Sequence, residues 1–67
     1  MGAAPPVEFD LRVQLPRDQA YALAQLCKRI GWQDAMTLSV DERECRLMIA
    51  VTDRVRDALE QAGVYVR

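Results

Sequence analysis

The chain has 67 residues, with nine Lys and Arg against ten Asp and Glu, two Cys and no His. A chain of this length forms one small domain that buries only about 60% of its unfolded surface, so we expect a partner chain to add stability. The net charge of -1 provides no basic field for a polyanion, and two Cys without His argue against a zinc site.

Residues 1–6, with Pro5 and Pro6, are expected to be a flexible leader before a single domain over residues 7–67. The leader has neither the positive start nor the apolar core of a signal peptide, and no apolar run is long enough to span a bilayer. We therefore expect a cytoplasmic protein with reduced thiols and no membrane contact.

Residues 7–15 alternate strictly between apolar and polar side chains. The odd positions are Val7, Phe9, Leu11, Val13 and Leu15, and the even positions are Glu8, Asp10, Arg12 and Gln14. A period of two predicts a half-buried β-strand. Because a lone strand leaves its backbone donors and acceptors unpaired, a partner strand is needed from this chain or from a second copy.

A first helix is predicted over residues 16–30. Pro16 suits its first turn, and apolar residues then recur at three- and four-residue spacing. Lys28 and Arg29 lie in the last turn, where cations meet the negative end of the helix dipole. Gly31 is expected in the left-handed position just beyond the helix. Residues 32–40 fit a short helical turn or a strand, and the pattern does not separate the two.

From Asp41 onward two interpretations compete. In the first, Asp41 caps a long helix, Glu44 completes a capping box, and Gly63 with Val64 forms a Schellman ending. In the second, residues 41–44 form a hairpin turn, 45–51 a strand, 53–62 a helix and 64–66 a strand. The first predicts an α+β fold, β-α-α with one N-terminal strand and a long C-terminal helix, similar to ribbon-helix-helix proteins; the second predicts a ferredoxin-like βαββαβ fold.

The order of these elements carries a resemblance. It lies in a strand followed by Leu-Pro, a helix ending Lys-Arg-Ile-Gly-Trp, then Val40-Asp41, Leu47-Met48 and a closing Ala-Leu-Glu-Gln-Ala-Gly. In these features the chain resembles a family of small uncharacterised proteobacterial proteins that is common on phages and mobile elements. The resemblance implies the helical interpretation of the second half and supplies no activity.

Side chains for catalysis are scarce. The chain has no His to act as acid or base, Ser39 has no base to activate it, and Cys27 and Cys45 lie on apolar stripes. We therefore expect no enzymatic activity, no metal and no cofactor.

The leading functional hypothesis is a non-enzymatic protein-interaction or inhibitor module from a phage or mobile element. It would form a homodimer through its first strands and would bind an unidentified host protein. Aromatic side chains are the expected anchors for that partner, namely Trp32, Tyr21 and Tyr65.

The alternative hypothesis is a ribbon-helix-helix transcriptional regulator that reads DNA. Arg12 pairs well with guanine and Gln14 with adenine, and Arg17 lies close by in the sequence. Glu8 and Asp10 share the face of Arg12 and would repel phosphates, so nucleic acid is possible but not favoured.

Overall fold

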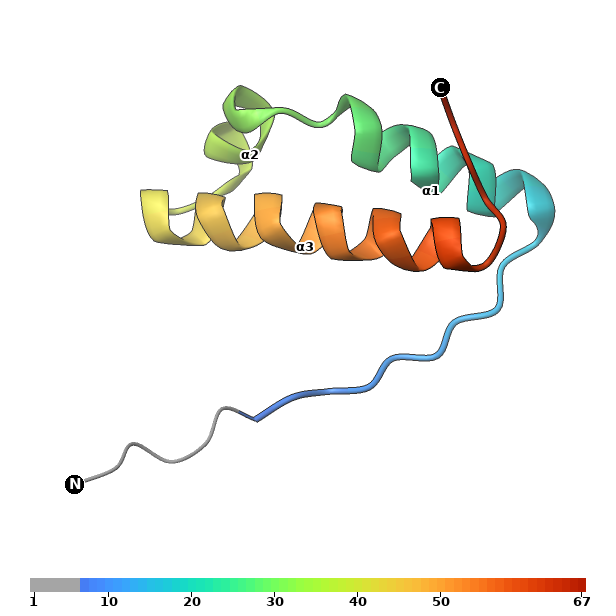
Figure 1. Cartoon of the computed structure of the whole chain (residues 1–67). Coiled ribbons are helices and arrows are strands. Elements are labelled where there is room, and N and C mark those ends of the chain that lie inside the picture. Colours follow the sequence, from blue (N-terminus) through green and yellow to red (C-terminus); the bar gives the residue numbers. More distant parts are fainter. Residues whose placement is uncertain (1–6) are drawn as a thin grey trace.

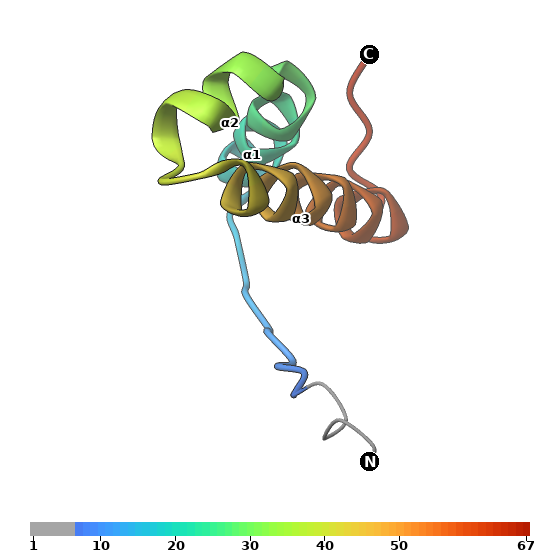
Figure 2. The ribbon, with the colours of Figure 1, turned by 90° about the vertical axis from the view of Figure 1, so that its left-hand side faces the viewer.

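The computed structural model describes residues 7–67, which contain three helices (Figure 1): α1 (Arg17–Arg29), α2 (Trp32–Leu38) and α3 (Glu42–Gln61). Both shorter helices pack against α3. Residues 7–16 are extended and run away from the helices, on the side of α3 opposite α1 and α2 (Figures 1 and 2). The predicted leader, residues 1–6, lies outside the described residues.

The first helix agrees with its prediction to within one residue at each end. Pro16 precedes it and accepts a hydrogen bond from the Ala20 amide at 3.0 Å. Ala20 and Ala24 are buried, and their small side chains allow α1 to approach α3 closely.

The expectation for Gly31 was wrong. Its φ of -112° and ψ of -178° are extended, and helix α1 already ends in an extended residue, Ile30. Gly31 instead precedes α2, where its amide donates to the Asp34 carboxylate at 2.9 Å. The Asp34 carboxylate thus satisfies the Gly31 amide, which has no backbone acceptor at the start of α2. Because α2 begins directly after Gly31, the chain needs no left-handed residue at this position.

The ambiguous stretch from Trp32 is helical. Ala35 of α2 and Cys45 of α3 are both fully buried, in the region where these two helices pack. The Cys45 thiol lies 3.7 Å from the carbonyl oxygen of Trp32, which ties the start of α2 to α3.

Helix α3 has the N-cap and the C-terminal ending that the sequence predicts, but Glu44 bonds to the residue before Asp41 and so does not complete the predicted capping box. The Asp41 carboxylate accepts from the Glu44 amide at 2.8 Å, and the Glu44 carboxylate accepts from the Val40 amide at 3.0 Å. At the other end, the Gly63 amide donates to the Glu60 carbonyl at 2.9 Å and the Val64 amide to that of Leu59 at 2.8 Å. These two bonds form a Schellman motif, and Gly63 has the positive φ, 93°, that the motif requires.

The predicted α+β fold class is wrong, because residues 7–67 contain helices and no strand. The ferredoxin-like alternative fails because α3 contains the residues that it assigned to a strand and to a second helix. The β-α-α arrangement fails at residues 7–15, which are extended but find no second extended stretch with which to pair. The long C-terminal helix of that prediction is confirmed.

The core between α1 and α3 is small. It contains Ala20, Ala24 and Leu59, with Leu23, Val55, Val64 and Val66 packed around them. Within the described residues, no helix combines the length and the apolar character that crossing a bilayer requires.

Candidate functional site

The apolar side chains of residues 7–15 are the most exposed large apolar group near the helices. We call them the apolar row. Their exposed fractions are 78% for Val7, 82% for Phe9, 86% for Leu11, 71% for Val13 and 36% for Leu15. The alternation that predicted a half-buried strand is therefore present, but the face that should be buried is open.

The backbone of the same segment is also without partners. Among the described residues, no hydrogen bond involves an amide or carbonyl of residues 7–15. The polar side chains of the segment are exposed. The ion pair found among residues 7–67 joins Arg46 to Glu42 in α3 at 2.6 Å, and it involves neither Asp10 nor Arg12. The segment thus offers apolar side chains, charges and a free backbone together.

A groove of 370 Å³ separates this segment from the helices, and every side chain that lines it is apolar. The segment contributes Leu11, Val13 and Leu15, and the helices contribute Leu23, Val55, Ala58, Leu59 and Ala62. The apolar row therefore has a matching apolar wall on α3.

The wall extends along α3 beyond the groove. Five apolar residues of α3 lie on one face of the helix, because they are three or four positions apart. We call them the α3 stripe: Leu47, Val51, Val55, Ala58 and Ala62. Four of them are exposed and Val55 is partly buried. The apolar arc of α3 is thus wider than α1 and α2 can cover.

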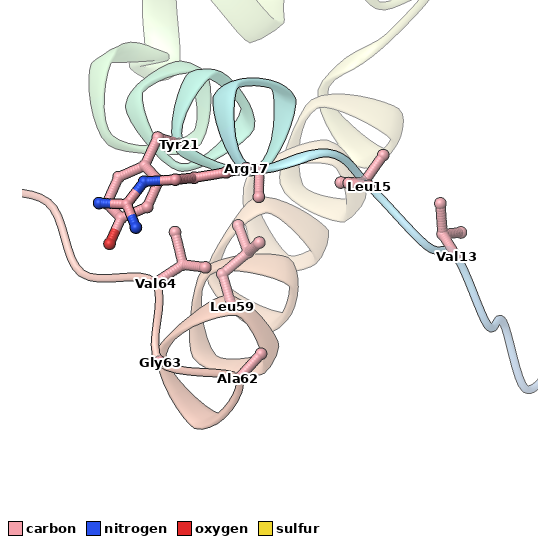
Figure 3. Close-up of a pocket in the computed structure, with 9 residues that line it drawn as sticks. Val13, Leu15, Arg17, Tyr21, Leu59, Ala62, Gly63 and Val64 are labelled. Atoms are coloured by element: carbon pink, nitrogen blue, oxygen red, sulfur yellow. The ribbon is translucent and has the colours of Figure 1, made fainter.

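A second hollow lies where the segment meets α1 (Figure 3). Its lining includes Leu15, Arg17, Tyr21, Leu59 and Val64. The Arg17 guanidinium lies over the Tyr21 ring, 5.2 Å from its centroid. This cation–π contact holds two of the predicted binding residues together at the edge of the hollow.

The other predicted partner-binding residues lie elsewhere. Trp32 begins α2, is 46% exposed, and has its carbonyl next to Cys45 near the start of α3. Tyr65 is 66% exposed and follows Gly63 at the other end of α3. Trp32, Tyr21 and Tyr65 therefore do not form one patch: Tyr21 is near the end of α3 and Trp32 near its beginning.

The residues proposed for DNA are separated in a similar way. Arg12 and Gln14 are exposed on the extended segment, whereas Arg17 begins α1 and contacts Tyr21. The ribbon that would carry Arg12 and Gln14 into a groove is missing from residues 7–67, and DNA binding stays a prediction.

Neither cysteine is in a reactive environment. Burial raises the pKa of the Cys27 thiol, and the positive charge of Arg56 offsets part of that increase. Cys45 is fully buried, and both thiols are free. The raised pKa of Cys27 disfavours the thiolate that nucleophilic chemistry requires. No group of three or more side chains that could hold a metal ion occurs within the described residues.

The sequence prediction missed the groove and the α3 stripe. The available signal was the width of the apolar arc, since a helix that packs against one layer needs a narrower stripe.

Comparison with known proteins adds a family and no activity. No curated protein and no solved structure matches the chain. The expectation of a family without a known function is confirmed, while its proteobacterial, phage and mobile-element setting stays a prediction. A family model matches residues 1–67, and the chain belongs to this family of unknown function (DUF7706).

Proposed function

We propose that this chain is a non-enzymatic protein-interaction module whose binding element is the extended segment 7–15 with the groove beside it. The observation that carries the proposal is the exposure of the apolar row next to an entirely apolar groove. Apolar surface gains about 25 cal/mol for each Å² removed from water, and contiguous exposed apolar patches usually mark interaction sites.

The chemistry of the segment favours a protein as the partner. An extended backbone with unpaired amides and carbonyls can exchange hydrogen bonds with another polypeptide, and alternate side chains then provide specificity. Glu8 and Asp10 lie on its polar side, and the whole chain has a net charge of -1, so phosphates are poor ligands here.

The biological setting is part of this proposal. The resemblance to proteins of phages and mobile elements supports a host protein as one partner, in the cytoplasm, with an inhibitory outcome. Trp32 and Tyr65 are exposed aromatic residues that could add contacts outside the segment.

The test is capture by the full chain. The tagged chain is immobilised and exposed to a bacterial lysate that also contains the untagged chain, and the retained proteins are identified by mass spectrometry. The variant Leu11→Asp places a charge in the middle of the apolar row. The control Leu38→Asp makes the same change at another exposed leucine, at the end of α2 and away from the groove.

We expect proteins that are retained by the original chain and the control and lost by Leu11→Asp. Each retained protein is then purified and its binding to the free chain is measured directly. Retention that is the same for all three chains, or no retention at all, would overturn the proposal. Retention only of DNA-associated proteins, abolished by nuclease, would favour the DNA-binding alternative.

A further inference from the structure

We infer that the occupant of the apolar row and the groove is a second copy of this chain. In the complex, residues 7–15 of the two copies lie antiparallel about a twofold axis at Leu11. The inference rests on the proposed function, because it takes the segment to be a protein-binding element, and it adds the identity of the partner.

The polar side chains of the segment are complementary to themselves in this register. With Leu11 opposite its own symmetry mate, Asp10 lies opposite the partner's Arg12, and Arg12 lies opposite the partner's Asp10. Opposite charges on directly facing residues stabilise antiparallel pairs. Glu8 lies opposite the partner's Gln14, so this register places no like charges against each other.

The neighbouring registers lack this match. An axis at Asp10 pairs Glu8 with the partner's Arg12 but places two aspartates face to face at the axis. An axis at Arg12 places two arginines face to face and pairs no opposite charges. A parallel pair in register would place each charged side chain beside the same side chain of the other copy, so that like charges face each other. A shift of one residue in one copy would put apolar side chains on the face of polar ones. Only the axis at Leu11 keeps the apolar row on one face and pairs opposite charges without setting like charges against each other.

The apolar side chains match as well. The axis at Leu11 sets Phe9 opposite the partner's Val13 and Val7 opposite the partner's Leu15, so that one face of the pair is entirely apolar. This face needs a cover, and the α3 stripe of each copy is an exposed apolar surface along the groove. Because the twofold axis relates the copies, both helices cover the same pair of segments, as in an isologous interface.

The exposed area is sufficient for such an interface. The chain has a solvent-accessible surface of 6136 Å², whereas a compact protein of 7.6 kDa has about 4,300 Å². The excess is about 1,800 Å², and a standard interface buries about 800 Å² on each partner. The excess exceeds this area even when half of it is set aside for the six residues outside the described range.

The experiment measures the mass of the full chain by sedimentation equilibrium over a range of concentrations, at low and high salt. The variants are Asp10→Arg, Arg12→Asp and the double exchange of both charges. Each single variant turns two opposite-charge pairs into like-charge pairs, whereas the double variant restores opposite charges with reversed sign. The control Asp53→Arg makes the same charge change at an exposed position of α3 that is not in the stripe. Circular dichroism checks that all variants keep their helices.

We expect the original chain to have twice the mass of one chain and each single variant to weaken the dimer roughly tenfold. The double variant and the control should dimerise like the original, and the effect of the single variants should shrink at high salt. A dimer that ignores the single variants, or a double variant that stays dissociated, would overturn the register and with it the inference.

A chain that is monomeric at every concentration would also overturn the inference. The proposed function would then still stand if the capture experiment retained another protein that Leu11→Asp loses. If the capture experiment also retained nothing, both the proposed function and the inference would fail.

Discussion

Leu59→Ala is the substitution for which the structure gives the clearest magnitude. Leu59 is the largest side chain in the core between α1 and α3, is 9% exposed, and packs with Ala20 and Ala24. Truncation of a buried leucine costs about 2–5 kcal/mol. We expect about 2–3 kcal/mol, because Leu59 also lines the open groove, where neighbouring side chains can relax. The hydrogen bond that the Val64 amide donates to the Leu59 carbonyl does not depend on the side chain.

The loss is large relative to the stability of the chain. Single domains have about 0.05–0.15 kcal/mol of stability per residue, which amounts to about 3–10 kcal/mol for 67 residues. A loss of 2–3 kcal/mol lowers the melting temperature of a domain this small by about 10–20 °C. Circular dichroism of the helix signal against temperature and urea measures both quantities, with every sample at the same concentration because association changes apparent stability.

Leu38→Ala is the matched control, since Leu38 is 67% exposed at the end of α2. We expect it to change the free energy of unfolding by less than about 0.5 kcal/mol. If the two leucine variants have equal stability, Leu59 is not the residue that joins α1 to α3, and the packing argument is refuted.

The remaining predictions concern the ends of α3 and one thiol. Asp41→Ala removes the cap of the Glu44 amide and should lower the urea midpoint by an amount equivalent to about 1 kcal/mol, and an unchanged midpoint would show that this cap adds nothing. Gly63→Ala should lower the free energy of unfolding by about 1–2 kcal/mol, measured by thermal unfolding. No atom lies within 4 Å of the added methyl group, so the cost comes from the positive φ alone. A neutral result would contradict the Schellman ending. Burial raises the pKa of Cys27, so the folded chain holds the thiol proton to higher pH than the unfolded chain, and stability should fall as the pH rises above the usual thiol pKa. Alkylation of Cys27, followed by mass spectrometry, should therefore require higher pH in the folded chain than in urea, and higher still in Arg56→Gln; identical pH profiles would argue against burial as the cause.

The helices could be predicted because their signals are local. Asp41 with Glu44, and Gly63 with Val64, place hydrogen-bonding groups within a few residues of each helix end, and the structure shows those bonds. Such signals depend on the chain immediately around them and not on the rest of the fold.

The extended segment could not be assigned in the same way. Alternation of apolar and polar residues reports that one face of an extended segment prefers to leave water, but it does not report which polypeptide will pair with it. Residues 7–15 show that difference: the predicted half-buried strand is wrong, because the extended segment pairs with no other stretch of residues 7–67 and its apolar face is open. Gly31 failed for a related reason, because a glycine after a helix can also begin the next one.

The groove could not be predicted from the sequence. Trp32 and Tyr65 are exposed as binding residues would be, but the groove beside residues 7–15 depends on how α1 packs on α3, which no local pattern contains. Leu47 joins the α3 stripe only once the direction of the α1 and α2 contacts is known.

Amide hydrogen exchange of residues 7–15 as a function of protein concentration tests directly whether a second chain covers the segment. We expect fast exchange in dilute solution, where the segment of a single chain is unpaired, and slow exchange at high concentration, where a second chain covers it. The variant Leu11→Asp should exchange fast throughout. Fast exchange of the original chain at every concentration, or protection that does not depend on concentration, would contradict the claim.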